Sequence, residues 1–315
     1  MKAVSLIRLG EKEEKLKERL PNIEFVFTSG VDEIADQDKK DLDILFGVGK
    51  LTEDFLEECP NLKWIAWYAT GVEKLPLDYL QRRNIILTNN KGAHEVQMSE
   101  FIIGYILADY KNMRTSFKNQ INRHYNSRLT GKNLKGQSIM FLGTGSIAQR
   151  TAQLAKAFGV RIIGVNTTGK QVDNFDETYN MEEVEQVIGY ADIVINTLPQ
   201  TTKTTHLLSK RHFELMKDTA LFINVGRGSV VKNEVIIEVL QNKIIRHAYL
   251  DVFENEPLSQ DSKFYDIDNI SITAHISGNN TEYSDEVTDI FIDNLKSFLN
   301  KDGTIENEVD ISKGY

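Results

Sequence analysis

Short segments rich in Val, Ile and Phe alternate with charged, helix-like segments along most of this chain, and this alternation constrains the fold more than any other feature. One series of such segments occupies residues 3–87, and a second begins at Ile139. Strands that alternate with helices form parallel sheets whose two faces are covered by the helices. The sequence therefore predicts an α/β protein that contains two doubly wound parallel sheets.

The first series predicts five strands and the second predicts six. The strands are expected at residues 3–7, 24–27, 44–48, 64–68, 85–87, 139–142, 161–165, 193–197, 221–225, 248–252 and 270–273. Helices are expected at residues 11–20, 53–59, 95–123, 148–158, 182–188, 210–216, 233–240 and 282–299. Thr52 precedes one of these helices and is predicted to be its N-cap.

Size and composition limit the class of protein. The 315 residues are enough for two domains, and the longest apolar stretch, residues 101–108, is far below the roughly 20 residues of a membrane-spanning helix. Arg8 interrupts the first apolar run, so no secretory signal is expected, and a single cysteine, Cys59, is typical of a reducing compartment. The 46 acidic residues outnumber the 37 basic ones, which is the reverse of most nucleic-acid-binding proteins. We therefore expect a cytoplasmic protein that binds neither membranes nor nucleic acids.

A glycine-rich turn joins the first strand of the second series to a helix. Residues 143–148 read Gly-Thr-Gly-Ser-Ile-Ala, the pattern G-x-G-x-x-A. Gly143 permits a tight turn, Gly145 lets a pyrophosphate approach the backbone, and the small Ala148 lets the helix pack closely on the strand. Glycines at such a place also occur in simple turns, but the strand, helix and next strand are all present here. The pattern therefore predicts a dinucleotide site.

The following strand ends in a polar turn that bears on the choice of dinucleotide. An acidic residue about 20 positions beyond the glycines normally binds the ribose hydroxyls, and this chain has Asn166 there, followed by Thr167, Thr168 and Lys170. A neutral amide does not repel a ribose phosphate, and a lysine attracts it. The turn therefore favours NADP(H) slightly over NAD(H), although use of both cofactors and a purely structural role for Asn166 stay open.

Three residues whose side chains are suited to catalysis follow consecutive strands of the second series. Arg227 lies between two glycines, Glu256 precedes a proline, and His275 ends the last strand. Each alone has an ordinary explanation as a surface arginine, a loop glutamate or a structural histidine. The carboxyl ends of parallel strands meet at one edge of a sheet, so we expect the three side chains to lie close together. An arginine fork suits a carboxylate, and a glutamate bonded to a histidine orients an acid/base catalyst.

Five motifs in this half of the chain occur in a fixed order. They read Leu198-Pro199-Gln-Thr201, Asn224-Val-Gly-Arg227-Gly, Leu250-Asp251-Val-Phe, Glu256-Pro257-Leu258 and Thr273-Ala-His275. In this order and spacing, the sequence resembles the D-isomer-specific 2-hydroxyacid dehydrogenases over essentially its whole length. The resemblance implies that Arg227 binds the substrate carboxylate and keto oxygen, that His275 is the acid/base, and that Glu256 is its partner.

The resemblance and the chemistry of the two turns together predict which residues contact the cofactor and the substrate. Substrate contacts are expected from Thr70 and Gly71 in addition to Arg227 and His275. No metal ligands are expected. Cofactor contacts are expected from Gly143, Thr144, Gly145, Ser146, Ile147, Asn166, Thr167, Thr168, Lys170, Thr197, Leu198, Pro199, Val225, Gly226, Asp251 and Ser277.

The family's organisation implies two Rossmann- or flavodoxin-like domains, the first of them discontinuous. Residues 1–96 and 283–315 would form the substrate-binding domain, residues 97–282 would form the dinucleotide-binding domain, and we expect a homodimer. The implied activity is the reversible NAD(P)-dependent reduction of a small 2-keto acid to a D-2-hydroxy acid. Two alternatives stay open, the oxidation of 3-phosphoglycerate and a non-catalytic NAD(P)-sensing role. Ala274 departs from the family's usual proline, and the tryptophan often found around His124 is missing.

Overall fold

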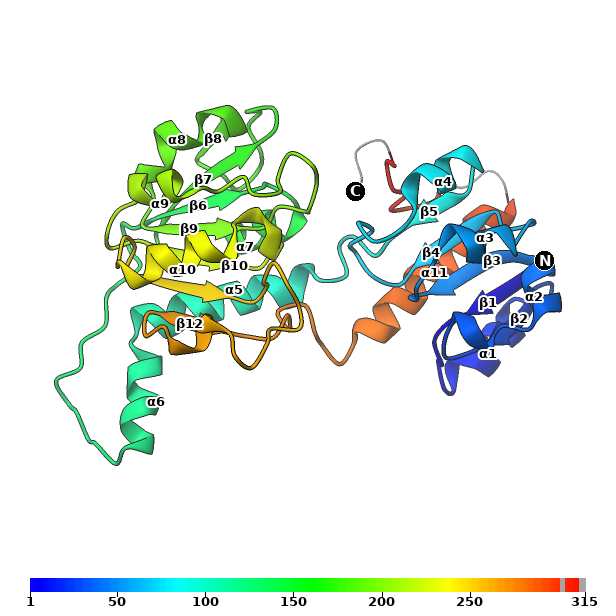
Figure 1. Ribbon diagram of the computed structural model, residues 1–315, viewed down its shortest axis with the longest axis horizontal. Coiled ribbons are helices and arrows are strands. Elements are labelled where there is room, and N and C mark those ends of the chain that lie inside the picture. The colour runs from blue at the N-terminus through cyan, green and yellow to red at the C-terminus, as the bar shows by residue number, and fades with distance from the viewer. Residues whose placement is uncertain (301–303, 312–315) are drawn as a thin grey trace. The chain divides into compact units, whose positions relative to one another are not determined.

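The chain forms two compact units in a computed structural model that describes residues 1–300 and 304–311 (Figure 1). Unit 1 comprises Met1–Ala93 and the C-terminal residues from Thr281 on, and unit 2 comprises His94–Asn280. The segment 283–315 was predicted for the first domain, and its residues 301–303 and 312–315 lie outside the described residues. The predicted fold class, with a discontinuous first domain, is confirmed.

Unit 1 is built on a five-stranded, all-parallel sheet of order β2-β1-β3-β4-β5, the order of flavodoxin-like folds. Its strands are β1 (Lys2–Ser5), β2 (Glu24–Phe27), β3 (Leu42–Gly47), β4 (Trp64–Trp67) and β5 (Ile86–Thr88). Its helices are α1 (Lys12–Arg19), α2 (Asp36–Asp41), α3 (Glu53–Glu57), α4 (Leu77–Arg82) and α11 (Tyr283–Asn300). The predicted cap is confirmed, because Thr52 Oγ1 accepts a hydrogen bond from the Phe55 amide at 3.2 Å.

Unit 2 is built on a seven-stranded, all-parallel sheet of order β12-β11-β10-β9-β6-β7-β8. The strand order therefore reverses between β6 and β9, which is where doubly wound sheets bind ligands. Its strands are β6 (Ser138–Leu142), β7 (Arg161–Asn166), β8 (Glu177–Asn180), β9 (Ile193–Asn196), β10 (Leu221–Asn224), β11 (His247–Leu250) and β12 (Ile270–Ile272). Its helices are α5 (Glu95–Tyr110), α6 (Met113–Ile121), α7 (Ser146–Lys156), α8 (Val184–Val187), α9 (Lys210–Leu215) and α10 (Asn233–Gln241).

Alternation along the buried strands divides each core between two faces of its sheet. On β6, Ile139 and Phe141 pack against α5 and α7, whereas Met140 and Leu142 pack on the side of α8, α9 and α10 (Figure 1). In unit 1, α3 and α4 cover one face and α1 and α11 cover the other. On that second face, Phe291 of α11 stacks on the Phe46 ring with centroids 4.1 Å apart. The last helix thus completes the core of the first unit.

Three expectations from the sequence need correction. The second sheet has seven strands rather than six, because the polar segment Glu177–Asn180 pairs with β7 at the edge of the sheet. The helix expected at 95–123 is broken between α5 and α6, where Asn112 adopts a left-handed φ of 53°. The short helices α2 and α4 were not predicted. Their few turns carry too little periodic pattern to distinguish them from loops.

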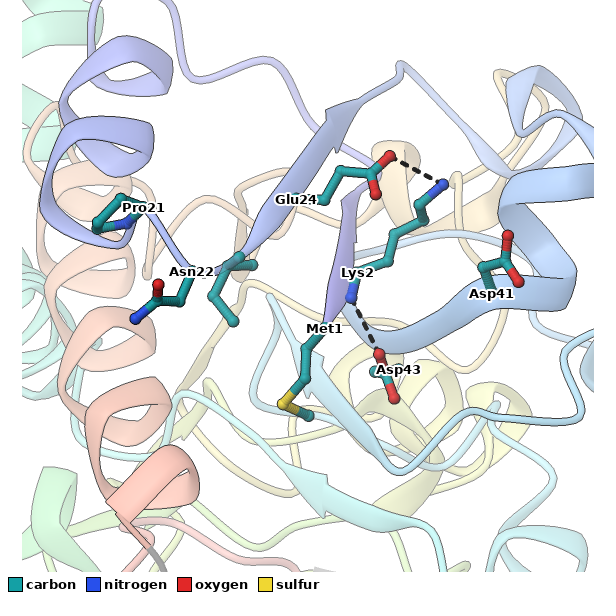
Figure 2. A pocket seen from close by; sticks show the side chains of 8 residues that line it. Met1, Lys2, Pro21, Asn22, Glu24, Asp41 and Asp43 are labelled. Carbon is teal, nitrogen blue, oxygen red and sulfur yellow. Dashed lines mark hydrogen bonds and ion pairs between the residues drawn. The ribbon is translucent and has the colours of Figure 1, made fainter.

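A hollow at the amino ends of the unit 1 strands is lined by charged side chains that satisfy one another (Figure 2). Lys2 Nζ lies 2.6 Å from Asp38 and 3.0 Å from Glu24, and Asp43 accepts the Lys2 amide at 2.9 Å. The hydrogen bonds that the Lys2 ammonium donates, first to Asp38 and then to Glu24, raise its pKa. Ligands of parallel sheets bind at the opposite, carboxyl edge. We therefore treat this hollow as structural.

Helix length and polarity also bear on membrane association. Across residues 1–300 and 304–311, the structure contains no helix with both the length and the apolar character needed to cross a membrane.

Candidate active site

Arg227 lies in the loop after β10, which packs tightly between the loops after β9 and β11 at the carboxyl edge of the unit 2 sheet. A Cβ atom at Gly226 would lie 2.7 Å from the Leu198 carbonyl oxygen, and one at Gly228 would lie 1.9 Å from the Phe253 carbonyl carbon. No side chain fits at either position, so the Gly-Arg-Gly sequence lets the loops after β9, β10 and β11 touch through their backbones. The half-buried Arg227 is therefore held between two fixed points.

Two asparagines that the sequence analysis did not single out support the same loop. Asn196 at the end of β9 donates to Asn224 Oδ1 at 2.8 Å, and Asn224 Nδ2 donates to the Arg227 carbonyl oxygen at 3.1 Å. Both asparagines are buried, and Asn224 Oδ1 also accepts the Gly226 amide at 3.2 Å. Each of the two core strands ends in Ile-Asn. This pattern could have pointed to the two asparagines, because a buried side-chain amide needs hydrogen-bond partners.

The structure brings Glu256 and His275 together, as the sequence predicted for neighbours on one sheet edge. His275 Nδ1 lies 2.7 Å from Glu256 Oε2, while Glu256 Oε1 accepts the Phe253 amide at 2.8 Å. His275 has a left-handed φ of 53°, a conformation that a residue other than glycine adopts only when its surroundings hold it there. The pair is partly exposed, with 51% of the His275 side chain and 33% of the Glu256 side chain open to solvent.

Asp251 supplies much of the framework that holds the His275 loop. Its carboxylate is fully buried and accepts the amides of Ile276 and Ser277, each at 3.0 Å, and its carbonyl oxygen accepts the His275 amide at 2.8 Å. The hydroxyl of Thr273 also donates to Asp251 Oδ1. The carboxylate thus builds the loop, and a contact of Asp251 or of the buried Ser277 with the cofactor stays a prediction.

His94 was not recognised from the sequence, yet it contacts the same loop. Its Nδ1 lies 3.0 Å from the Gly278 carbonyl oxygen. Burial lowers the pKa of His94, the hydrogen bond to Gly278 opposes this shift, and the charges of Arg227 and His275 lower the pKa further. His94 stands in no recognisable motif, so nothing in the sequence alone could have pointed to it.

The glycine-rich turn has the shape that a dinucleotide needs. Gly143 has a φ of 93°, and a Cβ atom there would lie 3.0 Å from Thr197 Oγ1. Gly145 precedes the first turn of α7, and a Cβ atom on it would meet nothing within 4 Å, so the amino end of the helix is open. Ser146 and Ile147 begin this helix, and Ala148 is buried against the sheet. Open backbone at a helix amino end fits a diphosphate group.

The turn after β7 is closed by the Asn166 side chain. Its Oδ1 accepts the amides of Thr168 at 3.0 Å and Gly169 at 2.8 Å, and its Nδ2 donates to Thr144 Oγ1 at 3.2 Å and to the Lys170 carbonyl oxygen at 3.1 Å. Asn166 therefore connects the two turns that were predicted to bind the cofactor. The side chain of Lys170 is exposed. Thr167 is exposed as well, and its carbonyl oxygen accepts a hydrogen bond from Asn180 at 3.1 Å.

The remaining predicted residues occupy two different units. Thr197, Leu198 and Pro199 follow β9, and Val225 and Gly226 follow β10, so all five lie at the carboxyl edge of the unit 2 sheet. Thr70 and Gly71 follow β4 in unit 1. There, Thr70 Oγ1 donates to the Asn90 carbonyl oxygen at 3.3 Å, and Trp67 Nε1 donates to the Gly71 carbonyl oxygen at 2.9 Å. Among the described residues, no three His, Cys, Asp or Glu side chains are grouped so as to hold a metal ion.

The reversal of strand order, the open glycine-rich turn beside it and the polar side chains after β10, β11 and β12 define a dinucleotide-binding α/β unit. The family model described as "D-isomer specific 2-hydroxyacid dehydrogenase, NAD binding domain" matches residues 103–277. The chain therefore belongs to the D-isomer specific 2-hydroxyacid dehydrogenase family, which confirms the resemblance drawn from the motifs. It is an oxidoreductase of the class that acts on CH–OH donors with a nicotinamide cofactor.

Relatives agree with this assignment. The chain is 29% identical over 256 residues to the glyoxylate reductase of Thermofilum pendens, with 79% of this chain and 76% of that protein covered. It is 28% identical over 264 residues to the D-3-phosphoglycerate dehydrogenase of Methanocaldococcus jannaschii, with 82% of this chain and 50% of that protein covered. The crystal structure of a D-isomer specific 2-hydroxyacid dehydrogenase family protein from Aeromonas salmonicida subsp. salmonicida A449 matches with a TM-score of 0.86 and 29% identity, covering 98% of this chain and 99% of that chain.

Proposed function

We propose that this protein reversibly reduces a small 2-keto acid to a D-2-hydroxy acid with NAD(P)H, using Arg227, Glu256 and His275. One observation carries the proposal. The three residues follow the neighbouring parallel strands β10, β11 and β12, and the His275 and Glu256 side chains are 2.7 Å apart. A histidine held by a carboxylate, together with an arginine at the same edge of the sheet, is the set of groups that keto-acid reduction requires.

The roles of the three residues follow from their chemistry. When bound, the reduced nicotinamide supplies the hydride. Glu256 binds Nδ1 of His275, which leaves Nε2 to donate a proton to the substrate oxygen as negative charge develops there. The Arg227 guanidinium binds the substrate carboxylate with two N–H groups and stabilises the same oxygen. The backbone contacts at Gly226 and Gly228 fix the backbone that carries Arg227, and Nη1 of its guanidinium donates to the Gly226 carbonyl oxygen at 2.9 Å.

We assign the recognition of the substrate carboxylate partly to unit 1. Thr70 and Gly71 lie in the loop after β4, and the hydrogen bonds from Asn89 to the Thr70 carbonyl oxygen and from Trp67 to the Gly71 carbonyl oxygen, both 2.9 Å long, fix its backbone. A fixed loop presents its amides to an anion without a further cost in entropy. Unit 1 then serves as the substrate-binding domain and unit 2 as the dinucleotide-binding domain.

We propose NADP(H) as the preferred cofactor, with NAD(H) as a poorer one. Position 166 carries a neutral amide whose hydrogen bonds are made within the two turns, so no carboxylate repels a 2′-phosphate there. Lys170 is exposed, so its ammonium is available to a phosphate. Residues 111–172 contain no Asp or Glu at all, although the chain as a whole carries a net charge of −9.

We further propose that the protein is a homodimer formed through α6 and the segment that follows it. This region extends away from the rest of unit 2 (Figure 1), and Met113, Phe117 and Ile121 expose one apolar stripe on α6. Residues 111–135 contain seven Lys or Arg and no acidic residue, so they are complementary to a second copy of this acidic chain. Sedimentation should show a dimer for the wild type and a monomer for the Phe117→Glu, Ile121→Glu double variant.

We propose a cytoplasmic location because the single cysteine is a free thiol. Cys59 is a free, fully buried thiol, and burial raises its pKa to about 11. A thiol of this kind needs no partner and is unreactive. It is compatible with a reducing compartment.

The proposed function is tested with a panel of 2-keto acids and their uncharged amides. Glyoxylate, hydroxypyruvate, pyruvate and 3-phosphohydroxypyruvate are incubated with NADPH or NADH, and the loss of nicotinamide absorbance is followed. We expect turnover of at least one acid, little turnover of its amide, and a loss of this preference in Arg227→Lys, because an ammonium lacks the two-pronged geometry. Fastest turnover of 3-phosphohydroxypyruvate would favour the phosphoglycerate alternative. If cofactor binds but no acid reacts, the proposal is wrong.

A further inference from the structure

The loop that carries His275 is tied to the start of helix α5 by a histidine that the proposed function does not use. His94 Nδ1 donates a hydrogen bond to the Gly278 carbonyl oxygen, 3.0 Å away. A carbonyl oxygen only accepts, so the ring proton is on Nδ1. The bond joins the first residue of unit 2 to a residue near its end.

Gly278 has the shape that this contact demands. A Cβ atom at position 278 would lie 2.9 Å from Nδ1 and 3.3 Å from Cε1 of the His94 ring. Any side chain there would displace the imidazole. The glycine thus allows the ring to lie directly against the backbone of the loop.

The side chain of His94 does not cap the helix that it precedes. His94 occupies the N-cap position of α5, but its side chain makes no capping hydrogen bond, and the Met98 amide bonds to its backbone oxygen instead. Burial lowers the pKa of the ring, and the nearby positive charges of Arg227 and His275 add to this effect against the opposing hydrogen bond of Gly278. The ring therefore stays neutral near pH 7, with its single N–H directed to Gly278.

We propose that His94 is a positioning residue, which holds Gly278 and thereby keeps His275 aligned with Glu256. The backbone of residues 275–278 needs support from both sides, because His275 has a left-handed φ of 53°. Asp251 holds the loop from the end of β11 through the amides of Ile276 and Ser277, and His94 holds it from the start of α5. The proposal rests on the proposed role of His275 as the acid.

Amide hydrogen exchange tests the structural half of this proposal without any substrate. His94→Leu keeps an apolar side chain of similar size but has no donor, whereas His94→Asn offers a side-chain N–H in place of Nδ1–H. The amides of Ile276 and Ser277 should exchange about fivefold faster in His94→Leu, the scale of one lost hydrogen bond, and close to the wild-type rate in His94→Asn. Equal exchange in the wild type and His94→Leu would overturn the proposal whatever the protein catalyses.

Kinetics on the best substrate of the panel test the functional half. His94→Leu should lower kcat about 10-fold or more, with an unchanged Kd for the cofactor, because a misplaced acid slows proton donation. The solvent deuterium isotope effect on kcat should rise, which a general loss of stability would not cause, and His94→Asn should restore both values. If the wild type is active and requires His275 but His94→Leu matches it in kcat and isotope effect, this proposal is wrong and the proposed function stands. If the wild type reduces no keto acid, the proposed function fails, and the exchange experiment alone decides whether His94 holds the loop.

Discussion

Unit 2 contains two histidine–glutamate pairs of closely similar geometry, and they differ in which part of the ring is left for chemistry. His275 Nδ1 lies 2.7 Å from Glu256, and His206 Nε2 lies 2.7 Å from Glu254. Both histidines have left-handed backbones, with φ values of 53° and 55°. The bond from His206 uses Nε2, the nitrogen farther from the backbone, whereas the bond from His275 uses Nδ1 and leaves Nε2 for the proposed proton transfer.

The two glutamates also differ in the backbone amide that each accepts in addition to its histidine. Glu254 also accepts the Asn233 amide at the start of α10, at 3.2 Å. Although burial opposes the shift, the hydrogen bonds from His206 and Asn233 lower the pKa of Glu254. This pair therefore joins two loops, whereas the second oxygen of Glu256 accepts the Phe253 amide within its own loop. The comparison teaches that a His–Glu contact by itself does not identify a catalytic acid, because two such contacts of similar length occur in one unit.

Replacement of each histidine by asparagine gives the largest expected difference between the two pairs. His275→Asn should lower turnover about 100-fold or more, the usual scale of general acid catalysis, with little change in cofactor affinity. His206→Asn is the matched control and should keep turnover within a few-fold of wild type while lowering the melting temperature. Steady-state kinetics and cofactor titrations measure both. Similar losses of turnover in the two variants would break the comparison.

Gly228 lies against the segment that carries both glutamates, so its replacement should disturb the two pairs together. A Cβ atom there would lie 1.9 Å from the Phe253 carbonyl carbon and 2.4 Å from the Glu254 amide nitrogen. Gly228→Ala should therefore lower the free energy of unfolding by at least about 2 kcal/mol, because backbone rather than a flexible side chain must move. Denaturant unfolding measures this.

A second glycine provides the control for that variant. Gly104 lies in α5, and a Cβ atom on it would meet nothing within 4 Å. Gly104→Ala should stabilise the protein by about 0.5–1 kcal/mol, because alanine loses less backbone entropy in a helix. A Gly228→Ala protein as stable as Gly104→Ala would show that the loops after β10 and β11 are not in contact.

Three other histidines of unit 2, His94, His212 and His247, are buried or half-buried, and they should make unit 2 more sensitive to acid than unit 1. All six histidines of the chain lie between residues 94 and 275. Burial lowers the pKa of His94 and His212, and it lowers the pKa of His247 to about 4. Below about pH 6.5 the unfolded chain binds protons that these folded residues do not, so stability falls as pH falls from 6.5 toward 4.

The size of this effect can be measured strand by strand. At pH 5, His247 alone should cost about 2 kcal/mol of stability. Amide protection factors, corrected for the intrinsic pH dependence of exchange, should fall more in β9 and β10 of unit 2 than in β3 and β4 of unit 1. His247→Asn should remove most of the difference. An equal fall in both units would contradict the assignment of acid sensitivity to buried histidines.

The sequence predicted the strands well wherever a run of Val, Ile and Phe is buried on both faces. It did not predict β8, because the segment Glu177–Asn180 has no such run and is recruited by pairing with β7. Likewise, the break at Asn112 depends on a left-handed residue that leaves no periodic signal. Elements set by local composition were thus predictable, and elements set by tertiary contact were not.

The same division applies to the candidate site. The shared sheet edge of the loops that carry Arg227, Glu256 and His275 was predictable, because chain order in a parallel sheet decides which loops meet. The support from Asn196, His94 and the Asp251 carboxylate was not, because it depends on the directions of side chains and on the backbone approach that glycines allow. His275 was singled out because it follows the last of three consecutive strands, and the family resemblance implied the same residue. Nothing in the sequence indicated that His206 also bonds to a glutamate of the same loop.

The smallest expected effect concerns the turn after β7, because cofactor preference there depends on a few separate side-chain contacts. Asn166→Asp keeps an oxygen for the amides of Thr168 and Gly169 but loses the donor to Thr144, and it places a negative charge where we propose that the ribose binds. Two like charges about 4 Å apart at a partly exposed site cost on the order of 1–4 kcal/mol, so the ratio of kcat/KM for NADPH over NADH should fall about 10-fold or more.

Lys170→Ala should reduce kcat/KM for NADPH about threefold and leave kcat/KM for NADH unchanged, as expected for one exposed ion pair. Lys118→Ala on α6 is a control for the loss of a positive charge elsewhere in the acid-free stretch. A wild type that strongly prefers NADH, together with a silent Lys170→Ala, would show that Asn166 only closes the turn.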